Sequence, residues 1–183
     1  MGEAINLVEN FKVEKVIFNC GEFNELEQEL IKVLVKKKIS YYSCIKELNV
    51  DTNKLYFLNN KNYGNENDNS SVIYTELKNH KFLFMGDAGI EVEEDLIKKY
   101  NLQDIDVLKV GHHGSKTSSS KNFINEVNPK YSIISVGKNN RYGHPNKEVL
   151  NNLDDSKIYR TDQNGSIMFK IRNNKLKIET CSP

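Results

Sequence analysis

The stretch IDVLKVGHHGS, residues 105–115, joins a short aliphatic run to a glycine-flanked pair of histidines. The run at residues 105–110 predicts a buried strand, and the glycines predict the turn in which it ends. Residues 121–127 then fit a helix that stops before Pro129. A strand that leads through a polar loop into a helix is the repeating step of an α/β sheet.

The same alternation of helices and strands extends in both directions from this stretch. Helices are expected at residues 3–10, 22–38, 91–100, 121–127 and 145–153. Strands are expected at residues 13–18, 39–44, 71–77, 81–85, 131–136, 157–160, 166–171 and 175–178. Residues 59–71 are rich in Asn, Gly and Asp and predict an exposed loop. Because 183 residues are enough for one core and few for two, we predict a single α/β domain over residues 1–183.

Charge and cysteine content narrow the class of protein. Lys and Arg total 26 against 25 Asp and Glu, so a nucleic-acid contact would depend on a local patch rather than on net charge. The cysteines, Cys20, Cys44 and Cys181, are odd in number and widely spaced, and we expect them to be reduced, mostly buried thiols. Since no apolar run approaches the roughly 18 residues of a membrane helix, we expect a cytoplasmic protein without a membrane segment.

Two polar residues follow expected strands and are candidate metal ligands. Asp87 comes after the strand at residues 81–85, between two small residues, and its carboxylate would either bridge cations or cap the next helix. His144 ends the loop after the strand at residues 131–136. A neutral imidazole at that place would either bind a divalent metal or lie exposed on a surface loop.

The histidine pair and the loop after it are candidates for catalysis. His112 and His113 are adjacent, so on an extended backbone their side chains would point to opposite sides and one would face a given site. Ser115, Thr117 and the serines at 118–120 supply small donors of the kind that hold an oxyanion such as phosphate. The alternative is that the pair belongs to partly exposed polar surface.

Cationic residues on the same loops favour a phosphate-bearing substrate. Lys116 beside the histidine pair and Arg141 before His144 would place positive charge next to the site, and with Thr117 they are the candidate substrate-binding residues. His80 lies in an expected hairpin turn without a second candidate ligand near it, and we expect it to be solvent-exposed.

Read together, four segments of the chain resemble one family. They are Gly86-Asp87, residues 106–120, residues 134–145 and residues 159–165. The family is the metallo-β-lactamase-fold domain found at the C-terminal end of ComEC-type DNA-uptake proteins and in related stand-alone hydrolases. The resemblance is dense over about residues 68–172. It implies an αββα sandwich with a metal site, commonly zinc, at the edge of two sheets.

The resemblance also implies roles for the candidate residues. Asp87 matches the bridging aspartate of the family, and His144 matches the late histidine that ligates the second metal. His112 and His113 match the family's His-His-Gly-Ser loop, in which one histidine faces the metal or the scissile phosphate and Ser115 assists.

One segment of the family pattern is missing from this chain. Such proteins carry an earlier His-x-His-x-Asp-His segment that supplies most ligands of the first metal, whereas residues 1–60 contain no histidine. The resemblance therefore implies a partial αββα sandwich that lacks the first strands, with zinc or another divalent metal weakly bound or absent. We also expect self-association through unpaired sheet edges.

These observations leave three hypotheses. The first is a metal-dependent hydrolase directed at phosphodiesters or nucleic acid, impaired in this form, and membrane-associated if it is part of a longer competence-type protein. The second is a metal-free remnant that acts as a binding or interaction module. The third is a zinc-independent phosphate-binding protein that uses the His112-His113 loop.

Overall fold

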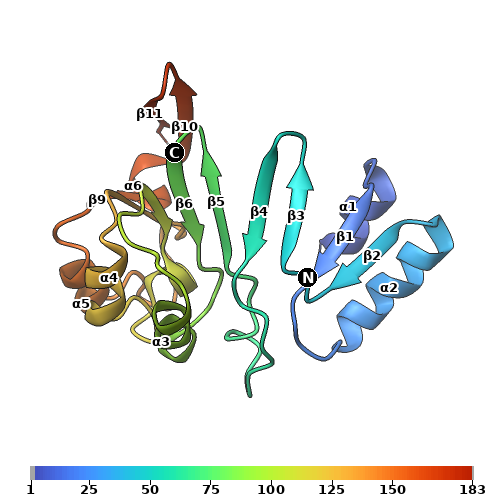
Figure 1. Cartoon of the computed structure of the whole chain (residues 1–183). Helices are drawn as coiled ribbons and strands as arrows, with labels where there is room; N and C mark the ends of the chain where they lie inside the picture. Colours follow the sequence, from blue (N-terminus) through green and yellow to red (C-terminus); the bar gives the residue numbers. More distant parts are fainter. Residues whose placement is uncertain (1–2, 183) are drawn as a thin grey trace.

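A seven-stranded mixed sheet is the centre of the computed structural model, which describes residues 3–182 (Figure 1). Its strands, in spatial order, are β3 (Glu47–Val50), β4 (Asn53–Phe57), β5 (Ile73–Leu77), β6 (His80–Phe84), β7 (Val107–Lys109), β8 (Tyr131–Ile134) and β9 (Lys157–Arg160). Neighbours from β3 to β6 are antiparallel, and neighbours from β6 to β9 are parallel. The predicted α/β fold class is confirmed, and the parallel half follows from the helices that connect its strands.

Three helices cover one face of this sheet and form the main core with it. They are α3 (Ile90–Lys99), α4 (Lys121–Val127) and α5 (Lys147–Asn152). Leu83 and Leu108 are fully buried in the cluster that also contains Val92 and Phe123 from the helices. Removing such a side chain from water contributes about 1.5–3 kcal/mol, so this face holds the parallel strands together.

A C-terminal hairpin lies on the opposite face. It consists of β10 (Ser166–Arg172) and β11 (Lys175–Cys181), which pair antiparallel. Phe169 of β10 makes edge contacts with Phe82 and Tyr131, with ring centroids 6.2 and 6.4 Å apart. Because side chains alternate along a strand, Phe82 points away from the face that carries Leu83.

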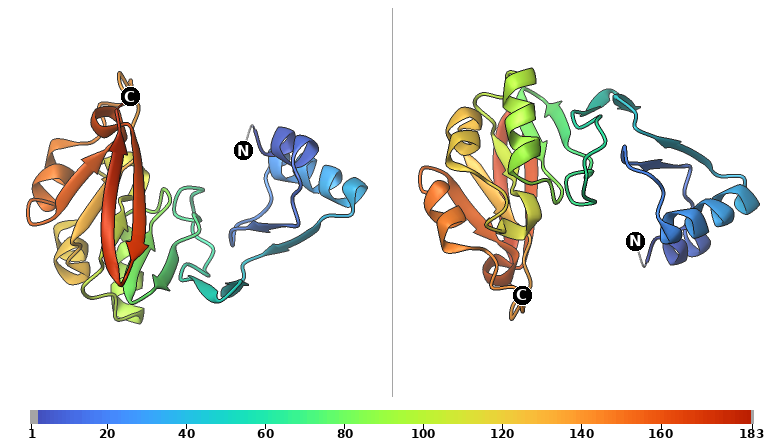
Figure 2. Two further views of the ribbon diagram at one scale, coloured as in Figure 1. Left: turned by 90° about the horizontal axis from the view of Figure 1, so that it is seen from above. Right: turned by 90° about the horizontal axis from the view of Figure 1, so that it is seen from below.

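The N-terminal residues form a separate small unit beside the large sheet (Figure 2). It contains α1 (Ala4–Asn10), β1 (Lys15–Phe18), α2 (Glu25–Lys37) and β2 (Ser40–Ser43), and β1 pairs parallel with β2. A capping box of Asn24 and Glu27 begins α2, which fixes the helix start. The unit has its own core, which consists of Val8, Phe18, Leu30 and Leu34.

A disulfide between Cys20 and Cys44 joins the two strands of this unit. The expectation that these residues are reduced thiols is therefore wrong. Parallel pairing of β1 and β2 brings the residues just beyond both strands together, with their Cα atoms 4.3 Å apart. Sequence spacing alone does not reveal this proximity. Within residues 3–182, Cys181 is unpaired and exposed.

Two further expectations differ from the structure. No element was expected at residues 45–57, where β3 and β4 form a hairpin on the edge of the large sheet. His80 is not a solvent-exposed turn residue, because it begins β6 and its side chain is 15% exposed. Its Nε2 donates to the Asn174 carbonyl at 3.0 Å, and its Nδ1 lies 3.5 Å from a carboxylate oxygen of Asp106. Long-range contacts of this kind bury a histidine that the local pattern places in a turn.

Across the part of the chain that the structure describes, every helix is too short or too polar to cross a membrane.

Candidate active site

The candidate residues follow the ends of three adjacent strands. Asp87 comes after β6, the single-turn 3₁₀ segment η1 (Gly111–Gly114) comes after β7, and the loop at residues 135–146 comes after β8. Since β6, β7 and β8 run parallel, their carboxyl ends lie at one edge of the sheet. Polar side chains at that edge are therefore held close together, as at many α/β sites.

Backbone hydrogen bonds tie these three segments to one another. The His112 amide donates to the Gly86 carbonyl at 2.9 Å, and the Asn146 amide donates to the Gly114 carbonyl at 2.8 Å. Gly114 has a φ of +79°, and a Cβ at this position would lie 2.6 Å from the Cβ of Pro145. Only glycine allows this approach, which brings the histidine loop against the loop that carries His144.

Both loop histidines face the site. The backbone is not extended here, because His112 and His113 have positive φ values of 44° and 55°, and the expectation that one histidine faces the site is wrong. Their rings consequently lie on the same side, with centroids 6.4 Å apart. His113 Nε2 is 3.6 Å from a carboxylate oxygen of Asp87, and the His112 ring centroid is 6.1 Å from that of His144. The structure thus brings the four predicted residues together as two neighbouring pairs.

Hydrogen bonds orient the histidines. His113 Nδ1 donates to the Ser135 carbonyl at 2.7 Å, so its Nε2 is left to face Asp87. The side chain of Asn140 holds the His144 backbone, donating to its carbonyl at 2.7 Å and accepting from its amide at 2.9 Å. The His113 ring and the His144 backbone are therefore each held by a residue that follows β8.

Burial shifts two pKa values in the site, and neighbouring charges modify both shifts. Burial, followed by the neighbouring His112 and His113, lowers the pKa of His144 and favours its neutral form. Burial also lowers the pKa of Lys109, and the Asp87 carboxylate opposes that effect. Lys109 was not predicted as part of the site. The signal was present, since Lys109 is a cation between the apolar residues Leu108 and Val110 of the expected strand.

The other predicted residues lie around the histidines. Ser115 is buried and shares a 3.1 Å hydrogen bond with Thr117, whose hydroxyl is also 3.3 Å from His112 Nδ1. Lys116 is exposed on the same loop. Arg141 lies against the Tyr142 ring at 5.0 Å and donates to the Tyr142 hydroxyl at 2.8 Å. Ser115 and Thr117 thus support the histidine loop, whereas Lys116 on that loop and Arg141 on the loop at residues 135–146 are exposed.

Comparison with known proteins identifies the family. The sequence model described as "Metallo-beta-lactamase superfamily" matches residues 40–138, a range that contains Asp87 and both loop histidines. The chain belongs to the metallo-β-lactamase superfamily.

Individual relatives agree with this assignment. The chain is 32% identical over 180 residues to "ComE operon protein 3" of Bacillus subtilis (strain 168), covering 94% of this chain and 23% of that protein. It is 37% identical over 118 residues to "Competence protein ComA" of Neisseria gonorrhoeae, covering 62% of this chain and 17% of the relative. It is 34% identical over 116 residues to "Recombination protein 2" of Haemophilus influenzae, covering 62% and 14%. The chain therefore spans less than a quarter of the length of these relatives.

Buried acidic residues support the site of this metallo-β-lactamase domain. Glu93 of α3 is fully buried and accepts hydrogen bonds from the amides of Ser119 and, at 2.9 Å, Ser120. Asp68 accepts from the Gly89 amide at 2.7 Å, close to the turn that carries Asp87. Sequence patterns did not distinguish these carboxylates from exposed ones, because their partners lie more than 20 residues away.

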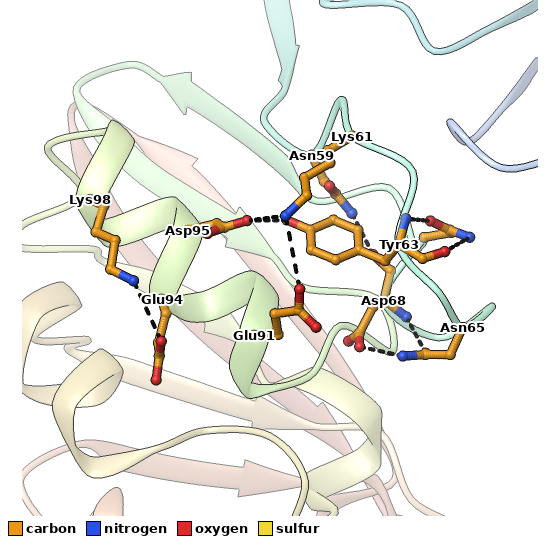
Figure 3. A network of polar contacts seen from close by, with 10 residues as sticks. Asn59, Lys61, Tyr63, Asn65, Asp68, Glu91, Glu94, Asp95 and Lys98 are labelled. Atoms are coloured by element: carbon orange, nitrogen blue, oxygen red, sulfur yellow. Dashed lines mark hydrogen bonds and ion pairs between the residues drawn. The ribbon is translucent and has the colours of Figure 1, made fainter.

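The loop at residues 59–70 is docked on α3 rather than simply exposed. Lys61 forms an ion pair with Asp95 at 3.0 Å, and the Tyr63 hydroxyl donates to the same carboxylate at 2.9 Å. Figure 3 shows these side chains. Tyr63 is buried in the main core, and the polar residues Asn59 and Asp68 are also buried. This docking positions Ser70, whose hydroxyl accepts from the Asp87 amide at 3.1 Å.

The carboxylate and imidazole groups of the site are chemically suited to a divalent metal, but they are not arranged around a single metal position. The superfamily is typically dependent on a divalent metal, and one carboxylate with three imidazoles is suitable chemistry for zinc. Within residues 3–182, however, there is no group of three or more His, Cys, Asp or Glu side chains arranged to hold a metal ion. The residues present form the pair Asp87 and His113 and the pair His112 and His144.

Proposed function

We propose that this domain is a hydrolase directed at phosphodiesters, such as those of nucleic acids, and related to DNA-uptake proteins. The observation that carries the proposal is the meeting of Asp87, His112, His113 and His144 at one edge of the sheet. Membership of the metallo-β-lactamase superfamily and relatives named as competence proteins support it.

Each residue of the cluster has a proposed role. Asp87 and His144 are the residues that would hold a divalent metal, commonly zinc, weakly in this chain. Such a metal lowers the pKa of a bound water and polarises a phosphoryl oxygen. His113, whose Nδ1 proton is fixed on Ser135, presents Nε2 for proton transfer at the phosphate. His112 lies beside it and, with Ser115 behind the loop, completes the polar wall.

The charge around the cluster supports an anionic substrate. Lys116 and Arg141 are exposed on the two loops that border the histidines, and Thr117 adds a hydroxyl. Lys109 adds a third cation near Asp87. A phosphodiester would thus meet cations on several sides of an otherwise balanced protein, whose net charge is +1.

The test is hydrolysis of bis(p-nitrophenyl) phosphate and of single-stranded DNA with zinc or manganese added in excess. We expect hydrolysis that depends on the added metal and is lost in Asp87→Ala. The control is Asp154→Ala, whose carboxylate is 67% exposed in a surface ion pair and should leave the rate unchanged. Absence of hydrolysis at every metal concentration would overturn the proposal, and retention of metal affinity by Asp87→Ala would exclude its role as a ligand.

A metal-free binding module is the second candidate. It is favoured by the open arrangement of the four donors, which form pairs rather than one enclosed metal site. In that case the protein would bind an oligonucleotide or phosphate equally well with and without chelator, and without turnover.

Location also belongs to the proposal. We propose that the domain works as part of a longer, membrane-associated competence-type protein, in line with its relatives. The expected cytoplasmic location stays a prediction, and the Cys20–Cys44 disulfide weighs against it, since disulfides persist in oxidising compartments. Trapping of free thiols in intact cells shows whether Cys20 and Cys44 are oxidised, which distinguishes an oxidising compartment from the reducing cytoplasm.

A further inference from the structure

A cavity lies directly beside the histidine cluster. It has a volume of about 390 Å³ and is lined by His113, Ser135, Val136, Gly137, Asn140, Tyr142, His144 and Thr161. Sites for small organic ligands span about 300–1,000 Å³, so this cavity matches a ligand with one or two rings. Two of its lining residues, His113 and His144, belong to the candidate active site. A group bound in the cavity would therefore be adjacent to the group on which the histidines act.

Planar side chains form one wall of this cavity. The Tyr142 ring is stacked on the His144 ring, with centroids 5.9 Å apart and an angle of 18° between the planes. On the same loop, the Arg141 guanidinium lies 5.0 Å from the Tyr142 ring and bonds to its hydroxyl. Tyr142 nevertheless remains 67% exposed. His144 and Arg141 hold the Tyr142 ring in place while most of its surface remains in solvent, and an exposed, ordered aromatic ring of this kind can stack on a further ring.

The rest of the cavity is firmly anchored. The Thr161 hydroxyl accepts from the Val136 amide and donates to the Val136 carbonyl, both at 2.8 Å, which fixes the wall after β8. Asn140 closes the loop onto the backbone of His144. The Tyr142 ring therefore lies on the same anchored loop that holds His144, which fixes its position relative to the histidines.

We propose that this cavity is a nucleobase subsite, in which one base of a single-stranded nucleic acid lies against Tyr142 while Arg141 binds an adjacent phosphate. A nucleotide contains both groups that this surface would bind, because its base can stack on Tyr142 and its phosphate can pair with Arg141. A base paired in a duplex is already stacked and cannot enter, so the site selects single strands. The inference rests on the proposed function, because it assigns the substrate of that same site.

The test measures binding without catalysis. Fluorescence anisotropy of a labelled short oligothymidylate is compared with that of an abasic deoxyribose-phosphate oligomer of equal length, with chelator present. We expect the oligothymidylate to bind more tightly, and Tyr142→Ala to weaken it by about 5- to 150-fold while Tyr142→Phe does not. Phe11→Ala is the matched control, because Phe11 is 68% exposed in the N-terminal unit.

A second pair of variants tests the cavity itself. Gly137 lines it, and a Cβ built there meets no atom within 4 Å, so Gly137→Leu would fill open space without disturbing the fold. Gly64, in the loop at residues 59–70, is equally open, and Gly64→Leu is the control. We expect Gly137→Leu to abolish the preference for the base-containing oligomer and Gly64→Leu to keep it.

Each outcome separates this inference from the proposed function. Equal affinity for the two oligomers, including no measurable binding of either, overturns the subsite even if phosphodiester hydrolysis is found. A preference for bases that depends on Tyr142, in a protein that hydrolyses nothing, supports the subsite and overturns the hydrolase.

Discussion

Breaking the Cys20–Cys44 disulfide is expected to destabilise the N-terminal unit by about 3.5 kcal/mol. The bond closes a loop with a sequence separation of 24 residues. The entropy that the unfolded chain regains when a loop of this size is opened gives about 3.5 kcal/mol at 25 °C. The perturbation is reduction of the protein or, without reductant, the Cys20→Ser and Cys44→Ser double variant.

The effect should be confined to residues 4–43. The core of this unit contains few large side chains, and Leu34 is the only one of its buried apolar residues with no exposed surface in the part of the chain described. The main core around Leu83 and Leu108 is a separate cluster. A loss of about 3.5 kcal/mol is a large share of the stability of a small unit.

The assay is hydrogen exchange followed by mass spectrometry, together with urea unfolding monitored by circular dichroism. Peptides from residues 4–43 should lose protection on reduction, while peptides from the main core should not. Cys181→Ser, which removes the exposed unpaired thiol, is the control and should change neither. Unchanged protection of residues 4–43, or an equal loss in both regions, would refute the reasoning.

Three further predictions concern other parts of the molecule. Glu93→Ala leaves two backbone amides without their acceptor and should lower the free energy of unfolding, measured with urea, by about 2–4 kcal/mol. The exposed Glu94→Ala is the control and should lower it by less than about 0.5 kcal/mol. Equal losses would contradict the burial argument. Because the pKa of His144 is lowered in the folded state, His144 becomes protonated at a higher pH in the unfolded protein than in the folded one. Its contribution to stability is therefore present above the ordinary value of 6.5 and falls as the pH drops below it, and an NMR titration that places His144 at or above 6.5 would refute this. Val50 is 44% exposed on the edge strand β3, so light scattering should show concentration-dependent association that Val50→Lys reduces; a wild-type monomer at every concentration would count against it.

Local sequence patterns were enough to locate the strands that carry the site and the polar residues that follow them. Apolar runs and glycines located the strands that became β6, β7 and β8, and the polar residues after them became the candidate site. Because these strands are parallel neighbours, Asp87, His112 and His144 had to meet at one edge. The order and the parallel direction of these strands are enough to bring the residues that follow them to one edge, whatever the positions of the side chains.

Contacts between distant residues account for what could not be predicted. Cys20 and Cys44 are 24 residues apart, and their proximity depends on the register of β1 with β2. On an extended backbone the two histidines would point to opposite sides, but His112 and His113 adopt left-handed conformations and Gly114 packs on Pro145. A short stretch of sequence contains no information on either contact, because the two residues of each contact belong to different segments of the fold.

Lys109 shows how such contacts change the chemistry of the site. Its place in an apolar run predicted a strand and nothing more, but the register pairs it with Phe84, three residues before Asp87. The carboxylate then opposes the effect of burial on the lysine pKa, which keeps a cation on the same sheet edge as the histidines. Charge of this kind is weakly screened because the side chain is half-buried. The electrostatic field at the candidate site is therefore set by β7 itself as well as by the loops that carry the histidines.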